Sequence, residues 1–443
     1  MRMRSLLVAA VVLAALAGGL WWSNKRREAE AKKPPVNPDT PTILAIPADR
    51  VVRIEIQQAG GSTAVERKAG KWELTAPQPL TADLEPVGAM LSTLSALTAI
   101  RIVEEVPADL AQYGLASPPV QLKVTQKDGR IRQVFIGDET PTGDGFYARV
   151  DGDPRVFMIA AYTKTTLDRS ANDLRDKRLL TFDPERLTRV ELAAKGQSLE
   201  FGRSSQNDWQ ILRPKPLRAD GGQVEELVRR LRDARMELPA SEEEARKAAT
   251  AFAAGTLIAV AKVTDPAGTQ QLTVRRDKDK NFYARSSVVE GIYKIAGDLG
   301  EGLDRGLEDF RNKKIFDFGW TDPARIEVRD GANQATYTRS GQRWMSGSRQ
   351  MEPVSMQMLV DKLRELAATG FPERGFTTAA IELAVTSEDG KRVERAALSR
   401  TGNDWFARRE NEPTIYQLDA KAVQELQQAF AAVKEAPQPK KKK

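Results

Sequence analysis

Apolar and polar residues alternate along much of this chain in short runs that predict β-strands. The first such run, residues 51–56, reads Val-Val-Arg-Ile-Glu-Ile, which is typical of a strand with one buried face. A second region, residues 65–74, turns at Gly70 and ends before Pro77, since proline cannot donate to a strand ladder. Residues 83–97 then carry apolar side chains three or four positions apart, which predicts an amphipathic helix.

Four further alternating runs follow, at residues 120–125, 131–136, 146–150 and 156–159. Short turns rich in Gly and Asp separate them, and a short helix is predicted from about Tyr162 to Asp168. Consecutive strands joined by short turns pair as an antiparallel meander. Helices packed on such a sheet place the unit in the α+β class.

The whole pattern occurs three times. Trp72 is followed 137 residues later by Trp209, and Trp344 follows after another 135 residues. The apolar positions of the helix keep this register in every copy: Val87, Leu91 and Leu94; Val224, Val228 and Leu231; Leu359, Leu363 and Leu366. Such self-similarity indicates duplication of one structural unit.

Two other features recur with the repeat. Asp83, Asp220 and Ser355 are each able to cap the helix that follows them. A strand with two aromatic residues, alanine and arginine recurs at residues 146–149, 282–285 and 405–408. Its alternation favours packing of the aromatic rings in the core over stacking on sugars or on a partner, and the three tryptophans are predicted to be core residues for the same reason.

We therefore predict an α+β fold of three tandem repeats, each a mainly antiparallel sheet with one long and one short helix, behind an N-terminal transmembrane helix. The predicted parts are a membrane anchor (1–24), a Pro- and charge-rich linker (25–45), three repeat modules (46–185, 186–321 and 322–436) and a basic disordered tail (437–443).

The N-terminal prediction depends on residues 6–22, which are apolar without interruption. As a helix this segment spans about 25 Å, which is enough to cross a membrane. Ala15-Leu16-Ala17 resembles a signal-peptidase site, so a cleaved signal peptide is the alternative. The apolar run continues beyond that site, which favours an uncleaved anchor. We expect a single-pass protein of the inner (cytoplasmic) membrane, with most of the chain on the periplasmic or extracytoplasmic side, although basic residues flank the segment on both sides.

Charge and composition narrow the class of partner. The chain has 443 residues and a net charge of +7. The first 33 residues carry seven basic and two acidic side chains, and Lys440–Lys443 add four basic ones, so the remainder has a net charge of −2. A nucleic-acid-binding protein concentrates basic charge on a folded face, so we expect no nucleic-acid partner.

The chain contains no cysteine and no histidine. Zinc sites built from these residues, thiolate nucleophiles and Ser-His-Asp triads are therefore excluded. No glycine-rich phosphate loop and no Ser-x-x-Lys pair occurs either. We predict a protein that is not an enzyme, with no catalytic residues and no cofactor.

Three short sequence segments of the first copy resemble those of a known family. They are Gly70-Lys71-Trp72-Glu73-Leu74, Asp109-Leu110-Ala111-Gln112-Tyr113-Gly114-Leu115 followed by Pro118, and Ile136-Gly137-Asp138-Glu139-Thr140. The chain resembles the domain-of-unknown-function family 4340 over nearly everything that follows the anchor. The resemblance implies an N-terminally anchored repeat protein, often encoded beside components of gliding-type ABC transporters, and it implies no catalytic residues.

One loop is a candidate for binding a hard cation. In residues 137–145, Asp138, Glu139 and Asp144 offer carboxylate oxygens, which calcium prefers. Their spacing does not match a calcium loop of the EF-hand type, and the second copy carries lysines here. A long hairpin loop is the favoured interpretation, and no metal is predicted.

The predicted joints between modules are basic. Their candidate residues for contact with an anion or partner are Arg175, Lys177 and Arg178, and Arg311, Lys313 and Lys314. Such clusters can receive phosphate or lipid headgroups. Solvation, or pairing with Asp173, Asp176 or Asp309, is the favoured alternative.

Together these features favour a non-enzymatic, membrane-anchored extracytoplasmic scaffold or accessory protein. Its expected partners are the membrane and envelope proteins, including subunits of an ABC-type transporter or another cell-envelope complex. A periplasmic module that binds envelope polymer or lipid is the alternative. A histidine-free hydrolase that works through carboxylates is the third hypothesis.

Overall fold

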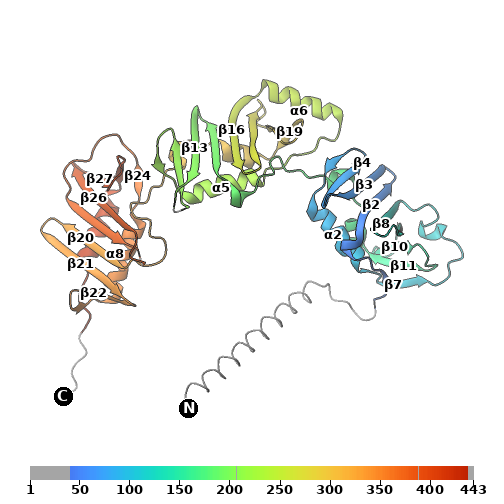
Figure 1. The fold of residues 1–443 in the computed structure, drawn as a ribbon, viewed down its shortest axis with the longest axis horizontal. Coiled ribbons are helices and arrows are strands. Elements are labelled where there is room, and N and C mark those ends of the chain that lie inside the picture. Colours follow the sequence, from blue (N-terminus) through green and yellow to red (C-terminus); the bar gives the residue numbers. More distant parts are fainter. Residues whose placement is uncertain (1–39, 206, 388, 438–443) are drawn as a thin grey trace, which may run out of the picture. The chain divides into compact units, whose positions relative to one another are not determined.

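The computed structural model describes residues 40–205, 207–387 and 389–437, which form three large antiparallel sheets (Figure 1). The chain divides into two compact units between Arg178 and Leu179. The first unit holds one of the three sheets and the second unit holds two. We call each sheet with its helices a module. The mainly antiparallel α+β fold predicted from the sequence is confirmed.

The predicted membrane anchor, most of the predicted linker and residues 438–443 of the predicted tail lie outside the described residues. Within the part of the chain that is described, no helix combines the length and the apolar character that crossing a membrane requires.

The sheet of the first module has the strand order β5-β4-β3-β2-β8-β9-β10-β11-β7. Its strands are β2 (Val51–Gln58), β3 (Gly61–Lys68), β4 (Lys71–Ala76), β5 (Leu80–Thr81), β7 (Arg101–Glu104), β8 (Val120–Gln126), β9 (Ile131–Glu139), β10 (Gly145–Val150) and β11 (Val156–Ala160). Its α-helices are α2 (Leu84–Ser95), α3 (Ala161–Leu167) and α4 (Ala171–Leu174), and β1 (Thr42–Leu44) pairs separately with β6 (Leu97–Thr98). The four strands predicted after α2 are all present.

The second module repeats the order of the first eight of these strands as β15-β14-β13-β12-β16-β17-β18-β19, and its described sheet has no strand in the place of β7. Its strands are β12 (Arg189–Ala194), β13 (Gln197–Arg203), β14 (Trp209–Arg213), β15 (Leu217–Arg218), β16 (Thr256–Asp265), β17 (Gly268–Arg276), β18 (Phe282–Ser286) and β19 (Ile292–Ile295). Its α-helices are α5 (Gly221–Arg232), α6 (Glu242–Ala254) and α7 (Gly297–Leu303).

The third module has the order β23-β22-β21-β20-β25-β26-β27-β28-β24. Its strands are β20 (Arg325–Asp330), β21 (Asn333–Ser340), β22 (Arg343–Ser346), β23 (Arg349–Gln350), β24 (Ala368–Gly370), β25 (Ile381–Thr386), β26 (Val393–Thr401), β27 (Asp404–Arg409) and β28 (Ile415–Leu418). Its α-helices are α8 (Pro353–Glu365) and α9 (Ala420–Ala431).

The helices depart from the predicted pattern of one long and one short helix in each module. The second module contains the additional helix α6, which has 13 residues. The last helix of the third module, α9, has 12 residues, whereas its counterparts α3 and α7 have 7. Ser241 caps α6 through a hydrogen bond from the Glu244 amide, and acidic residues fill its first turn, so local sequence stabilises this helix.

Two of the three predicted helix caps are confirmed, and the third is wrong. Asp83 and Asp220 accept hydrogen bonds from the amides of Glu85 and Gln223 at the starts of α2 and α5. The cap of α8 is Glu352, which accepts from the amide of Ser355, while Ser355 itself is buried in the first turn. Pro353 explains the earlier start, since proline fits the first helical position and has no N–H to satisfy.

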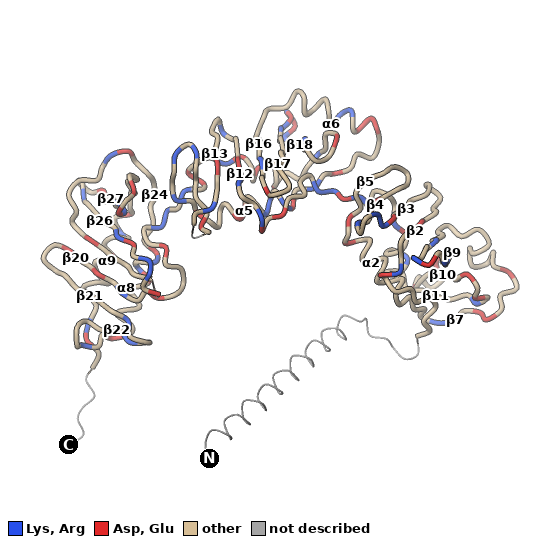
Figure 2. The backbone as a smooth tube through the Cα atoms, viewed as in Figure 1, with Lys and Arg blue, Asp and Glu red and all other residues tan. Residues whose placement is uncertain are grey.

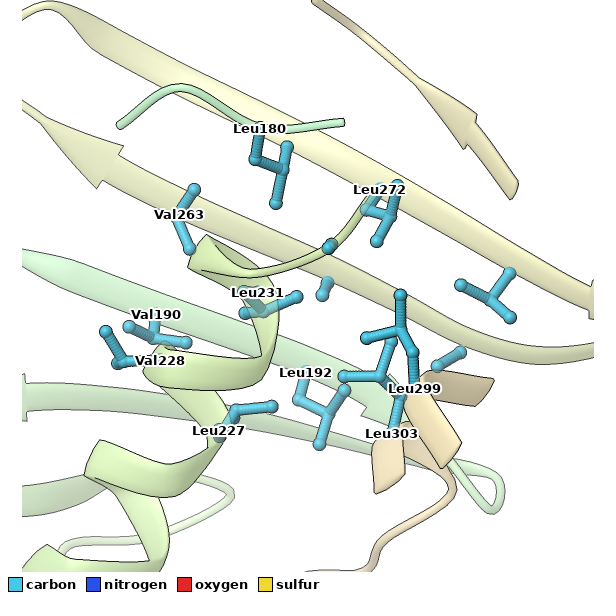
Figure 3. Packing of buried hydrophobic residues seen from close by; sticks show 14 of the residues in the cluster. Leu180, Val190, Leu192, Leu227, Val228, Leu231, Val263, Leu272, Leu299 and Leu303 are labelled. Atoms are coloured by element: carbon cyan, nitrogen blue, oxygen red, sulfur yellow. The ribbon is translucent and has the colours of Figure 1, made fainter. Parts of the chain in front are cut away.

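The repeated apolar residues form the core of each module. Trp72, Trp209 and Trp344 are only 5–7% exposed, so their prediction as core residues is confirmed. In the second module, Leu227, Val228 and Leu231 of α5 pack over Val190 and Leu192 of the sheet (Figure 3).

The aromatic strand that recurs in each module divides its side chains between the two faces of the sheet. In the second module, Phe282 and Ala284 belong to the core. The neighbouring Tyr283 and Arg285 lie on the opposite face, as strand alternation requires. The predicted core packing therefore holds for the first aromatic residue of this strand, and the second aromatic residue and the arginine are available for other contacts.

At the end of each module, the chain forms a backbone bridge to the residue that follows the edge strand of the same module's sheet. Backbone bridges join Ala82 to Arg175, Ala219 to Arg311 and Met351 to Glu435. In the first module the amide of Asp83 donates to the carbonyl of Leu174 over 2.8 Å. Because the edge is paired within the module, it is unavailable for strand addition by another chain there.

Two segments of the first module lie in direct contact although they are distant in sequence. The 3₁₀ turn η2 (Ala111–Tyr113) and Gly114 pass over Gly137 and Asp138 near the end of β9. Gly114 has a φ of +66°, which favours glycine. The hydroxyl of Tyr113 donates to Glu104, and this hydrogen bond, aided by burial and the charge of Glu104, raises the pKa of Tyr113 to about 12.

We expect the substitution Gly137→Ala to destabilise the first module by about 1–3 kcal/mol. A Cβ atom at this position would lie 2.1 Å from the carbonyl oxygen of Tyr113, so the covering segment has to move. The matched control is Gly88→Ala in α2, where a Cβ meets nothing within 4 Å and helix propensity favours alanine by about 1 kcal/mol. Thermal unfolding of the full chain compares the two variants, and equal effects would contradict the close approach.

Candidate functional site

The third sheet has one face packed against α8 and α9 and a second face that carries mainly charged and small residues. Directly opposed residues of antiparallel strands point to the same side, so the pairing register identifies this second face. One row across five strands is Gln334, Arg329, Glu382, Ala397 and Arg408. The next row is Thr336, Glu327, Ala384 and Arg395. We call these nine residues, together with Phe376 and Glu410, the open face.

A groove of about 480 Å³ lies in the open face, and Ala384 and Ala397 line it. The other modules carry a lysine at the position of Ala384. The corresponding cross-strand pairs are Glu55–Lys123, Glu191–Lys262 and Glu327–Ala384. In the first two pairs the ammonium lies 3.8 and 3.5 Å from the carboxylate. The third module therefore has free space where a lysine side chain lies elsewhere.

The connection between the long helix and the central strands covers the same face in the first two modules. In the first module this connection places Tyr113 against Tyr147 of β10, with ring centroids 4.9 Å apart. In the second module it contains α6, and Phe252 of that helix lies under the guanidinium groups of Arg275 and Arg285. In both modules the protein's own chain thus packs on this side of the sheet.

The third module has the shortest of these connections, residues 366–380. Gly375 has a φ of +132°, and a Cβ there would lie 2.6 Å from the ring of Phe406, so the segment passes close to the sheet. Phe376 follows and is the aromatic residue of this segment that reaches the groove. Apart from Phe376 and Ala379, no described residue of this short connection lines the groove.

The charges of the open face are paired, with one exception. Arg329 pairs with Glu382 at 3.4 Å and Arg395 with Glu410 at 3.3 Å. All four of these side chains are more than half exposed, so each pair contributes about 0–1 kcal/mol to stability. Among the described residues no carboxylate pairs with Arg408, whose guanidinium lies over the ring of Phe376 at 4.9 Å.

This arrangement of arginine over phenylalanine recurs in the three modules. The pairs are Arg149 over Phe135 at 5.2 Å, Arg285 over Phe252 at 5.6 Å and Arg408 over Phe376 at 4.9 Å. The Nε atom of Arg149 is buried without a hydrogen-bond partner in the described part of the chain. The third pair borders the groove that Ala384 and Ala397 line. Charged residues of both signs are interspersed over all three modules (Figure 2).

The first group of predicted contact residues lies where the chain leaves the first module. Arg178 forms a two-pronged ion pair with the buried Asp176, with a shortest distance of 2.6 Å, and this hydrogen bonding raises the pKa of Arg178. Arg175 takes part in the backbone bridge to Ala82, and Lys177 is half-buried beside it. Arg178 thus pairs with Asp176, as the alternative interpretation of this group expects.

The second group lies at the end of the second module. Arg311 is largely buried, with its guanidinium 3.4 Å from the ring centroid of Phe371 and 3.2 Å from Glu308. Lys314 pairs with Asp317 at 3.6 Å, and Lys313 is exposed. Arg311 and Lys314 thus have their own partners, and the structure does not gather the three cations around a common site.

A buried ion network lies beside this second group. Arg409 is 11% exposed and holds Glu394 at 2.9 Å and Glu412 at 2.8 Å, and it also donates to the carbonyl of Ile315. Burial alone would raise the pKa of Glu394, but Arg409, the amide of Asp317 and Arg392 outweigh it and lower that pKa. Burial and a hydrogen bond to Glu412 raise the pKa of Tyr416 to about 12.

Arg218 of the second module joins this network. Its guanidinium donates to the carbonyl of Lys314 over 2.8 Å and lies 3.8 Å from both Asp317 and Glu412. Asn312 donates to Asp317 over 2.9 Å. The network therefore links residues of the second and third modules within the second unit, and we assign it a structural role.

The candidate metal residues of the first module are exposed. Asp138 lies against Gly114, and Glu139 and Asp144 flank the turn between β9 and β10. In the part of the chain that the structure describes, no group of three or more acidic side chains is placed to hold a metal ion.

The open face is not evident from the sequence. Residues of this face come from five strands, and alternation alone cannot show which small residue lies opposite which charge. One signal was available: the repeat offset places Glu327 on Glu191 and Glu55, and the strand facing each glutamate carries lysine in two copies and alanine in the third.

Comparison with known proteins gives a family and no function. A sequence profile of the family described as Domain of unknown function (DUF4340) matches residues 72–251 and, in a second overlapping match, residues 209–386. The two matches begin at Trp72 and Trp209, which are equivalent positions of the repeat. No curated protein and no solved structure matches the chain significantly.

Proposed function

The chain belongs to the DUF4340 family, and we propose that it is a non-enzymatic, membrane-anchored scaffold outside the cytoplasm that holds a protein partner on the open face of its third module. The partner is a component of an ABC-type transporter or of another cell-envelope complex. In this proposal the three modules are copies of one repeat that follow an N-terminal transmembrane helix.

The groove in the open face is the observation that carries this proposal. The first two modules use the same face to pack a segment of their own chain, so this side of the sheet is suited to polypeptide contacts. The third module offers the face with a shorter connection, two alanines and an arginine without a carboxylate partner among the described residues. Exposed concave surfaces with a few directed polar groups are typical of binding sites.

The proposed place in the cell depends on the sequence of residues 6–22. An uninterrupted apolar segment of this length supports an anchor in the inner membrane, and the long folded part then lies on the periplasmic or extracytoplasmic side. The linker rich in proline and charge would hold the modules away from the membrane surface.

Photo-crosslinking in intact cells tests the scaffold proposal. A photoreactive amino acid replaces Ala397 in the groove, and a control places it at Gln424, which is exposed on α9. We expect the Ala397 probe to form a discrete adduct with a transporter or envelope-complex subunit, identified by mass spectrometry and confirmed with a tag on that subunit. The Gln424 probe should not form it.

Other outcomes of this experiment decide between the alternatives. Adducts of the Ala397 probe with cell-wall polymer or lipid would replace the scaffold by the polymer- or lipid-binding hypothesis. Equal protein adducts from both positions would show that the groove is not the partner surface. If the protein remains in the supernatant when the membranes of lysed cells are pelleted without detergent, the proposal of an anchored scaffold is wrong.

A further inference from the structure

Arg408 is the charged group of the open face that has no opposite charge beside it in the described part of the chain. Its guanidinium lies over Phe376, which fixes the plane of the group and leaves its N–H edges free. A guanidinium presented in this way matches a carboxylate, because two parallel N–H groups can donate to the two oxygens. The ligand should therefore supply an anionic group next to Arg408 in the groove.

The rest of the groove favours an apolar neighbour for that anion. Ala384 and Ala397 provide small side chains, and the flanking pairs Arg329–Glu382 and Arg395–Glu410 are already neutralised internally. The groove includes the position that a lysine side chain takes up in the other modules. It suits one or two aliphatic side chains next to a carboxylate.

The two other modules indicate that the occupant is a polypeptide. Each of them places a segment of its own chain on this face, with an aromatic residue close to the arginine-bearing strand: Tyr113 beside Tyr147, and Phe252 beside Arg285. Among the described residues of the third module, the connection contributes Phe376 and Ala379 to the lining of the groove and nothing further. A segment from another protein would occupy the corresponding position.

From these observations we propose that the groove binds a short polypeptide segment of a partner protein in which an acidic residue lies next to aliphatic residues, with the carboxylate on Arg408. This inference rests on the proposed scaffold function and specifies the chemistry of the partner. The contact with Arg408 sets the position of the segment, and the aliphatic side chains contact Ala384 and Ala397.

Fluorescence anisotropy with the purified full-length protein in mild detergent tests the proposal. The probes are labelled hexapeptides that alternate leucine with glutamate, with glutamine or with lysine. We expect the glutamate peptide to bind and the other two to bind at least about tenfold more weakly, as the loss of a charge-assisted hydrogen bond predicts. Failure of the glutamate peptide to bind would overturn the proposed chemistry.

Two variants and one control locate the site. Arg408→Gln should weaken binding of the glutamate peptide by about tenfold or more. Ala384→Lys should also abolish binding, because it restores the lysine of the other modules and fills the groove without disturbing the fold. The control is Arg400→Gln, an exposed arginine of β26 that donates to the carbonyl of Gly402, and it should leave binding unchanged. Equal binding by all four proteins would contradict the assignment.

Further probes distinguish a wrong ligand from a wrong function. If an acidic polysaccharide or vesicles with anionic lipid bind in an Arg408-dependent manner and the peptide does not, the polypeptide assignment is wrong. If the Ala397 crosslink to an envelope protein persists in cells carrying Arg408→Gln, the scaffold function stands and the role of Arg408 is overturned. If that crosslink is absent while the peptide binds, the peptide chemistry stands and the cellular proposal fails.

Discussion

Replacement of Arg409 by methionine is expected to destabilise the third module by about 3–5 kcal/mol. The substitution leaves Glu394, which is 5% exposed at its side chain, without the guanidinium that lies 2.9 Å away. A buried ion pair that loses one partner costs about this much because the remaining charge lies in a region of low dielectric, and Arg392, which is half-exposed and 2.9 Å from Glu394, offsets only part of that cost. The loss of the contacts to Glu412 and to the carbonyl of Ile315 adds to the effect.

Hydrogen exchange measured by mass spectrometry on the full chain is suited to this prediction, because three separate cores need not unfold as one cooperative unit. Protection should fall in β26 and β27 and stay unchanged in β2 and β8 of the first unit. The matched control is Arg395→Met, which breaks the exposed pair with Glu410 and should cost about 0–1 kcal/mol. The double variant Arg409→Met with Glu394→Gln should recover part of the loss.

The effect of Arg409→Met should depend on pH in a defined direction. The folded protein lowers the pKa of Glu394 below its ordinary value of 4.5, so ionisation of this group stabilises the folded state. This contribution is complete above the ordinary pKa and disappears as the pH falls through the lower pKa of the folded state. The difference between wild type and variant should therefore narrow in acid, and a difference that stays constant down to about pH 2 would contradict the assignment.

The regular parts of the fold could be predicted from the sequence because they follow from local periodicity. The alternation in residues 120–159 gave β8, β9, β10 and β11, and the helical spacing after Asp83 gave α2. The helix α6 has no counterpart in the first copy, so the repeat does not predict it, although Ser241 and the acidic residues after it are a strong start signal. The repeat offset places the cap of α8 at Ser355, whereas Pro353 fits the first helical position and makes Glu352 the cap.

The candidate site was much less accessible to sequence analysis. The groove of the open face depends on Ala384 and Ala397, which are unremarkable residues in a one-dimensional pattern. They become informative only when the register places them opposite Glu327 and Arg408. The basic residues near the module ends are visible in the sequence as charge, and Asp176 is a candidate partner from its position beside them. The partner of Arg311, Glu308, is identified only by geometry.

The substitution Trp344→Ala is expected to have an effect of similar size on the core. This side chain is 5% exposed and belongs to the apolar cluster that joins β22 to α8. Truncation of a buried tryptophan removes its transfer free energy and leaves a cavity, which together cost about 3–5 kcal/mol. The equivalent Trp72 and Trp209 lie in separate clusters, so the loss should be confined to the third module.

The chain supplies a control with the same chemistry. Trp320 lies just before the third module and is 92% exposed, so Trp320→Ala should change the unfolding free energy by no more than about 0.5 kcal/mol. Hydrogen exchange of β25 and β26 compares the two variants, and the strands β16 and β17 of the second module serve as the internal reference. If Trp344→Ala lowers protection in the reference strands as much as in its own module, the cores are energetically coupled. The modules would then unfold as one body, and the three separate apolar clusters would not correspond to separate units of stability.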